Sequence, residues 1–167
     1  PMAGNGLRFK MEGYTQPKML LTAHGKTLLE WSVDSLPLKL CTKLVFIGLQ
    51  EHEDQFSICQ FIKEKYASRV LEIQFKFLKN TTRGQSETVL AGLSKDDFDI
   101  PLLIFNIDTR FSSSTLEGAL IKNKDTGYLG SFKELTPHFS FARTDKNGFV
   151  IEVAEKVAIS NNALTGL

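Results

Sequence analysis

The chain opens with Pro1-Met2-Ala3-Gly4-Asn5-Gly6-Leu7-Arg8-Phe9, and Pro17-Lys18 follows after a polar spacer that contains Gly13. Two glycines in a tight loop let backbone N–H groups approach an oxyanion without interference from a Cβ atom. Arg8 and Lys18 can neutralise a polyphosphate, the arginine as a planar fork and the lysine as a point charge. The stretch therefore predicts a phosphate-binding loop.

Composition narrows the class of protein. The 167 residues are 42% hydrophobic and 23% charged, as in an ordinary globular domain. The net charge of +1 provides no general attraction to nucleic acid or to a membrane surface. No apolar run approaches the ~20 residues that span a bilayer. We expect a cytoplasmic protein in which Cys41 and Cys59 are reduced thiols rather than a disulfide or a metal-ligand pair.

Strand-like and helix-like segments alternate along the rest of the chain, which predicts an α/β fold with a largely parallel sheet. The turn-forming residues Asp145-Lys146-Asn147-Gly148 separate the last two expected strands. The expected strands are 43–49, 71–78, 101–107, 126–132, 138–144 and 149–155, and the expected helices are 27–36, 53–66 and 86–93.

The combination of residues 3–8 with Pro17-Lys18 resembles the signature loop of the sugar-phosphate nucleotidyltransferase family. Its local form looks most like bacterial members linked to capsule or lipopolysaccharide sugars. The resemblance covers essentially the whole chain in family order, and it implies a three-layer α/β/α Rossmann-like fold with a mixed, mostly parallel sheet. Residues 1–167 would form a single nucleotidyltransferase domain that lacks the family's first strand and its C-terminal part.

The resemblance also implies roles for individual residues. The backbone of the opening loop would hold the nucleotide phosphates, and Gln85 offers both a donor and an acceptor to a base edge. In this chain the family's catalytic cations would be Arg8 and Lys18, its nucleotide-binding residues Ala3, Gly4, Gly6, Gly84, Gln85 and Asn106, and its sugar-phosphate site Glu155, Lys156 and Asn161.

Asp108 is the expected metal ligand. It follows the apolar run 101–105, and carboxylates at the carboxyl end of a strand lie where open α/β sheets bind ligands. Mg²⁺ prefers a few carboxylates together with substrate phosphate oxygens, and the family carries an Asp here for that purpose. Each motif also has a purely structural alternative: Asp108 as a turn cap, Thr82 or Ser86 as a helix N-cap, and Glu155-Lys156 as a solvated charged turn.

The implied reaction joins a nucleoside triphosphate to a sugar 1-phosphate, releases pyrophosphate and yields a nucleotide sugar for surface polysaccharide synthesis. A non-catalytic regulatory domain and a phosphoalcohol cytidylyltransferase are the alternatives. The nucleobase, the sugar and the oligomeric state stay open, although an edge left by a missing first strand would favour a homo-oligomer. His24, His52 and His138 show no ligand spacing and are interpreted as surface or packing residues.

Overall fold

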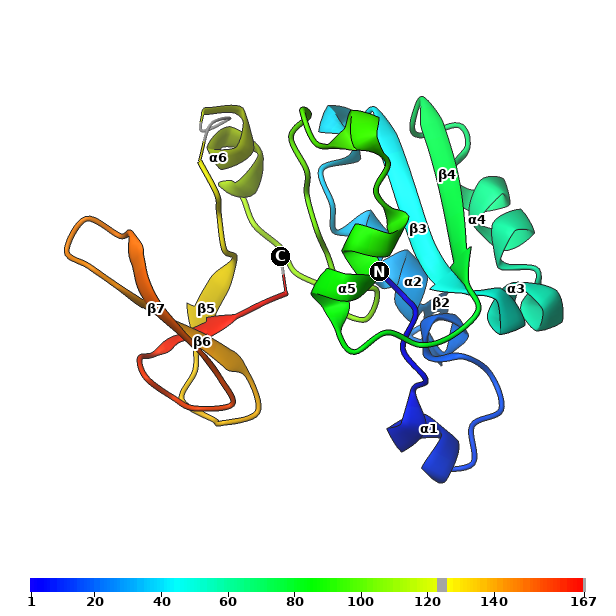
Figure 1. Cartoon of the computed structure of the whole chain (residues 1–167), viewed down its shortest axis with the longest axis horizontal. Coiled ribbons are helices and arrows are strands. Elements are labelled where there is room, and N and C mark those ends of the chain that lie inside the picture. Colours follow the sequence, from blue (N-terminus) through cyan, green and yellow to red (C-terminus); the bar gives the residue numbers. More distant parts are fainter. Residues whose placement is uncertain (123–125, 167) are drawn as a thin grey trace. The chain divides into compact units, whose positions relative to one another are not determined.

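Two seven-residue strands, β3 (Lys43–Leu49) and β4 (Glu72–Leu78), form a parallel ladder in the computed structural model (Figure 1). The structure describes residues 1–122 and 126–166. The ladder runs in register from the Lys43–Glu72 pair to the Leu49–Leu78 pair. β3 reads as an almost continuous apolar run and its last four residues are buried, as expected of a strand covered on both faces.

Helices pack against both faces of β3. Consecutive strand residues point to opposite faces, so Phe46 and Ile47 meet different neighbours. Phe46 lies in a core with side chains of α2 (Leu28–Asp34) and α4 (Ile58–Tyr66), whereas Ile47 lies against Gly92, the last residue of α5 (Gln85–Gly92). The core cluster consists of Met2, Met19, Leu29, Val33, Leu38, Phe46, Ile58, Ile62 and Tyr66.

Local sequence explains the two helices of this core. α2 begins with a capping box, in which Thr27 Oγ1 accepts a hydrogen bond from the Glu30 amide at 3.1 Å and the Glu30 carboxylate accepts one from the Thr27 amide at 2.9 Å. In α4, Ile58, Ile62 and Tyr66 recur every four residues and are at most 1% exposed, so they form one buried face.

The chain divides into two compact units, Pro1–Lys124 and Asp125–Leu167, which we call the first and the second unit. No described helix combines the length and the apolar character needed to cross a membrane. The first unit also contains α1 (Leu7–Met11), α3 (Gln50–Phe56), α6 (Leu116–Lys122), the short pair β1 (Thr22–Ala23) and β2 (Lys26–Thr27), and 3-10 turns at Lys18–Leu20, Leu38–Leu40 and Lys95–Asp97.

The second unit is an antiparallel sheet in the order β5-β8-β6-β7. Its strands are β5 (Ser131–Lys133), β6 (Ser140–Thr144), β7 (Val150–Glu155) and β8 (Asn162–Leu164). The Asp145 carboxylate accepts hydrogen bonds from the amides of Asn147 and Phe149, each at 2.9 Å, and Gly148 takes a φ of +87°. These contacts confirm the turn predicted between the last two strands.

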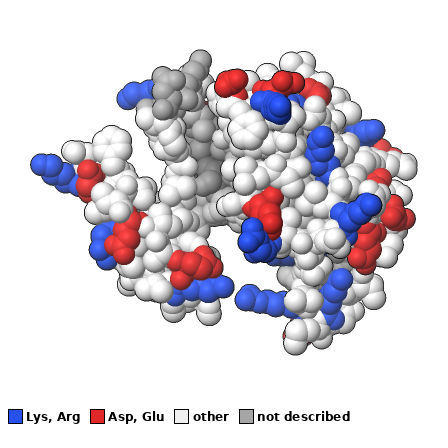
Figure 2. Space-filling view, in the orientation of Figure 1, with Lys and Arg blue, Asp and Glu red and all other residues white. Residues whose placement is uncertain are grey.

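Charge is mixed on the face of the protein that Figure 2 shows. Among the described residues drawn in Figure 2, basic and acidic side chains are interspersed and form no broad patch of one sign. This distribution agrees with the net charge of +1.

A mixed α/β fold is confirmed, but the finer prediction is not. Among the described strands only β3 and β4 pair in parallel, while β1–β2 and the sheet of the second unit are antiparallel. The mostly parallel sheet and the complete three-layer arrangement are therefore not confirmed. The single nucleotidyltransferase domain stays a prediction.

Three predicted elements differ from the structure. Residues 101–106 form no strand, and Leu102, Leu103 and Ile104 are 36–51% exposed, because an apolar run becomes a strand only where a neighbour completes its ladder. The predicted helix 53–66 is two helices, since Ser57 takes the left-handed conformation with a φ of +51°. The predicted strand 126–132 forms a strand only at its end, in β5.

We expect the stability of the protein to fall between pH 7 and pH 5 because of His52 in α3. The side chain is 5% exposed, its Nδ1 has no hydrogen-bond partner in the described chain, and burial lowers its pKa. A lowered pKa means that the unfolded state binds the proton first, so stability is complete above the ordinary histidine pKa of about 6.5 and declines as the pH falls below it.

Chemical denaturation at pH 5, 6 and 7 tests this expectation. The free energy of unfolding should rise with pH in the wild type and vary less in His52→Leu. Parallel profiles for the two proteins would contradict it.

Candidate functional site

The opening segment is anchored to the edge of β3. The Met2 amide donates a hydrogen bond to the Ile47 carbonyl at 2.7 Å, which directs Ala3 and Gly4 past the end of the ladder. Gly6 then turns the chain with a φ of +59°, in the left-handed region that favours glycine. The predicted loop is interrupted by the short helix α1, so only residues 3–6 and 12–17 around it are irregular.

Lys18 lies beside the opening segment. It follows the buried Pro17, and its Cβ is 3.5 Å from the place where a Cβ on Gly6 would lie. Lys18 Nζ forms an ion pair with the carboxylate of Asp108, ninety residues later in the chain, and the two side chains are 34% and 33% exposed. The folded chain therefore brings together the predicted phosphate-binding lysine and the predicted metal ligand.

A cleft of about 270 Å³ gathers most of the residues predicted from the sequence. Gly84 and Gln85 enter it from the start of α5, and Asn106 and Asp108 enter it from the segment after residue 105. Every nucleotide-binding residue predicted above lines this cleft: Ala3, Gly4, Gly6, Gly84, Gln85 and Asn106, together with Lys18 and Asp108.

Arg8 lines a second hollow, of about 440 Å³, which shares Gly4, Gly6, Lys18 and Thr82 with the first. The Arg8 side chain is exposed and forms no ion pair with another described residue. The two adjacent hollows therefore contain one cation already paired with a carboxylate and one cation available to an anion.

Two threonines at the cleft were not among the predicted site residues. Thr82 and Thr88 both line it, their hydroxyl oxygens are 2.6 Å apart, and each hydroxyl lies 3.1 Å from the Gly84 carbonyl oxygen. These hydroxyls hold the Gly84 peptide in place instead of capping α5, so neither Thr82 nor Ser86 is the N-cap, which is Gly84. A pair of threonines six residues apart across a strand–helix loop was the available signal.

The carboxylate available to a metal in this cleft is that of Asp108. Across the described residues, no three side chains of His, Cys, Asp or Glu come together as a ready-made metal site. A Mg²⁺ ion held by one carboxylate and by substrate phosphates needs no such cluster. The position of Asp108 at the cleft, where it already attracts the cation of Lys18, fits that kind of binding.

The predicted sugar-phosphate residues belong to the second unit. The Glu155 carboxylate accepts a hydrogen bond from the Ser140 hydroxyl, which lowers the pKa of Glu155, and its other oxygen is 3.4 Å from Lys156 Nζ. Lys156 takes a φ of +55°, a strained conformation for a residue with a side chain. His24 and Ser57 take similar conformations, so the role of Glu155 and Lys156 in the sugar-phosphate site stays a prediction.

Asn161 has a different neighbour. Its amide oxygen accepts a hydrogen bond from Lys133 Nζ at 3.0 Å, and Lys133 also donates to Asn162 at 2.7 Å. Lys133 is a further cation that sequence reasoning missed, since nothing in its surroundings in β5 indicates a site. The contribution of these residues to the substrate site stays a prediction.

Comparison with solved structures identifies the family. The nucleoside-diphosphate-sugar pyrophosphorylase from Vibrio cholerae RC9 is 35% identical to this chain and superposes with a TM-score of 0.76, over 99% of this chain and 69% of that one. This chain belongs to the sugar-phosphate nucleotidyltransferase family.

A second solved structure shares the nucleotidyltransferase fold at lower identity. It is a Bacillus anthracis protein assigned as a glucose-1-phosphate thymidylyltransferase and solved with sucrose. It is 20% identical, with a TM-score of 0.74 over 99% of this chain and 67% of its own. No protein-family model matches this nucleotidyltransferase, and no curated protein sequence matches it either.

Proposed function

We propose that this nucleotidyltransferase transfers a nucleotidyl group from a nucleoside triphosphate to a sugar 1-phosphate. The observation that carries the proposal is the cleft in which the glycine-rich opening, Lys18, Gln85 and Asp108 meet. The pyrophosphorylase that is 35% identical supports the same reaction class. A role in surface polysaccharide synthesis and the complete three-layer fold are parts of this proposal.

In the proposed reaction, a phosphate oxygen of the sugar 1-phosphate attacks the α-phosphorus in line. The new P–O bond forms while the bond from the α-phosphorus to the β-phosphate oxygen breaks, so pyrophosphate leaves with that electron pair. Such a displacement needs positioning and charge stabilisation more than covalent help from side chains. Arg8 and Lys18 would stabilise the charge of the triphosphate, and the Gln85 side chain beside Gly84 would contact the base.

Asp108 would hold Mg²⁺, which neutralises phosphate charge when it is bound. When the nucleotide is bound, the Lys18 ammonium group would contact a phosphate in place of the Asp108 carboxylate, because the same group serves both contacts. In the second unit, Glu155 would accept hydrogen bonds from sugar hydroxyls, while Lys156 and Asn161 would contact the sugar phosphate. These assignments leave the choice of base and sugar to experiment.

Thermal unfolding with each common nucleoside triphosphate, with and without Mg²⁺, tests the proposal. A ligand that binds only the folded state stabilises it by mass action, by about 2.7 kcal/mol at a hundredfold excess over Kd. For a protein of this size we expect one nucleotide to raise the midpoint by about 5 °C or more, in a Mg²⁺-dependent manner. Pyrophosphate release in a screen of sugar 1-phosphates and phosphoalcohols then identifies the acceptor.

Matched variants sharpen the result. Arg8→Ala and Lys18→Ala should reduce the nucleotide-induced shift, because Lys18 lines both hollows and Arg8 lines the second. Lys10→Ala should keep the shift, because Lys10 is an exposed cation of the same helix as Arg8 but lines neither hollow. The absence of a shift with every nucleotide would contradict the proposal, and a shift without turnover for any acceptor would indicate a regulatory nucleotide-binding protein.

A further inference from the structure

The segment that carries Asp108 has no regular secondary structure to hold it. Residues 101–115 form no helix and no strand in the described chain. A carboxylate that binds a metal must be held within a fraction of an ångström, which a strand would normally ensure through its ladder. The contacts that hold this segment must therefore come from side chains.

The first such contact is made by Ser32 of α2. Its hydroxyl donates a hydrogen bond of 2.6 Å to the carbonyl oxygen of Asn106, two residues before Asp108. Ser32 is 2% exposed and Asn106 is half-buried, so the bond is partly shielded from water. Its loss would remove a hydrogen bond worth about 1 kcal/mol and leave the Asn106 carbonyl without this protein partner.

The second contact lies two residues after Asp108. The guanidinium carbon of Arg110 lies 4.8 Å from the ring centroid of Trp31, within the range of a cation–π interaction. Phe105 and Phe111 also meet edge to face, with centroids 5.2 Å apart, which closes the segment on itself. Consecutive residues of α2, Trp31 and Ser32, thus hold the chain on both sides of Asp108.

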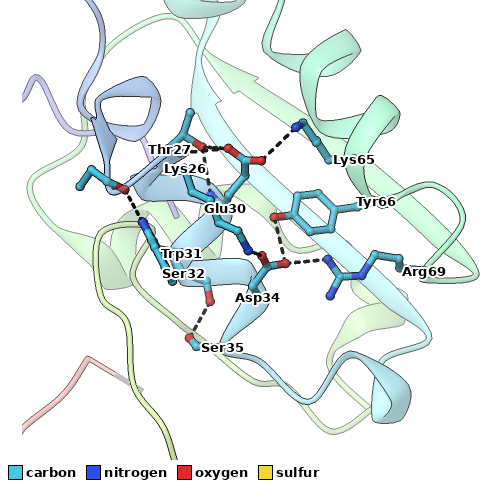
Figure 3. Close-up of polar contacts among 11 residues, drawn as sticks. Lys26, Thr27, Glu30, Trp31, Ser32, Asp34, Ser35, Lys65, Tyr66 and Arg69 are labelled. Carbon is cyan, nitrogen blue, oxygen red and sulfur yellow. Dashed lines mark hydrogen bonds and ion pairs between the residues drawn. The ribbon is translucent and has the colours of Figure 1, made fainter.

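α2 is itself firmly anchored, as Figure 3 shows. The Trp31 indole N–H donates to the Ala23 carbonyl at 2.7 Å. The Asp34 carboxylate accepts hydrogen bonds from Lys26 Nζ at 2.7 Å and from the Arg69 guanidinium at 2.6 Å. Burial alone would raise the pKa of Asp34, but these hydrogen bonds outweigh that effect and lower it. A helix tied to its neighbours at both ends can serve as a rigid support for another segment.

We propose that Trp31 and Ser32 are positioning residues that hold the 105–111 segment so that Asp108 is presented to the metal of the nucleotide site. The inference rests on the proposed function. Neither residue lines the cleft, so both act through Asn106 and Arg110. In this proposal α2 holds the metal ligand in place, as the ladder of a sheet usually does for a ligand at the end of a strand.

Ser32→Ala is the principal test, and Ser35→Ala is its matched control. Ser35 lies just after α2 and donates to the Ser32 carbonyl at 2.7 Å, so its loss removes a hydrogen bond of the same helix without touching the Asp108 segment. In Ser32→Ala we expect the Mg²⁺ concentration that gives half of the nucleotide-induced thermal shift to rise about tenfold, as for other partners that orient metal ligands. Arg110→Ala should give a rise in the same direction without altering α2.

A second measurement needs no ligand. Arg110 is exposed, but trypsin cleaves after it only when the residues on either side leave their contacts. The loss of the Ser32 hydrogen bond should make this cleavage about five to ten times faster in Ser32→Ala. Cleavage after Arg83, whose side chain is 92% exposed, provides an internal reference that should not change.

Equal behaviour of Ser32→Ala and Ser35→Ala in both measurements would overturn the proposal, as would a lower midpoint with an unchanged Mg²⁺ requirement and unchanged cleavage. A wild-type protein without any Mg²⁺-dependent shift would contradict the proposed function instead. The two failures are distinguishable because the cleavage comparison requires neither nucleotide nor metal.

Discussion

Asp108→Ala should lower turnover by about a hundredfold or more, because a metal that neutralises phosphate charge contributes several kcal/mol to transition-state stabilisation. The measurement is pyrophosphate release at saturating nucleotide, Mg²⁺ and sugar 1-phosphate. The fold should survive the change. Asp108 is a third exposed and pairs with one lysine, and such surface ion pairs contribute at most about 1 kcal/mol to stability.

The control for this variant is Asp99→Ala. Asp99 is exposed, is close in sequence and lines neither hollow, so its removal should leave turnover unchanged. The Mg²⁺-dependent part of the nucleotide-induced thermal shift should disappear in Asp108→Ala and persist in Asp99→Ala. Near-normal turnover in Asp108→Ala would rule out Asp108 as the metal ligand.

Gly92→Ala should destabilise the protein by about 1–3 kcal/mol, although alanine is ordinarily the better helix residue by about 1 kcal/mol. Gly92 is buried at the end of α5, and a Cβ added there would lie 2.1 Å from Ile47 Cδ1 and 2.4 Å from Ile47 Cγ1. Ile47 is 4% exposed within β3, so its side chain has little space to move. The measurement is the free energy of unfolding by chemical denaturation.

Two further variants decide whether the clash is the cause. Gly118→Ala is the control, because Gly118 lies inside α6 with no atom within 4 Å of an added Cβ, and there alanine should stabilise by up to about 1 kcal/mol. In an Ile47→Ala background, Gly92→Ala should lose its penalty, since the clashing atoms are gone. Equal effects of Gly92→Ala in both backgrounds would contradict close packing of α5 on β3.

Sequence periodicity predicted the elements whose pattern is complete within their own residues. β3 begins and ends where its apolar run does, and the capping box at Thr27 marks the start of α2. Periodicity failed at two places, one that lacks a pairing strand and one with a local break in the backbone. The apolar run at 101–106 forms no strand, and the helical pattern of 53–66 is broken by one left-handed residue, Ser57.

The opening motif of the sequence carried the resemblance to the family. That resemblance predicted residues that line one cleft, among them Asp108, Gln85 and Asn106, because the chain follows the family's order of motifs. Only the tertiary structure showed that Lys18 pairs with Asp108 and that Thr82 and Thr88 hold the Gly84 peptide. It also decided that Ser32 supports the Asp108 segment. A serine within a helix has no sequence pattern that reveals its partner, since the hydrogen bond depends on how segments 74 residues apart pack together.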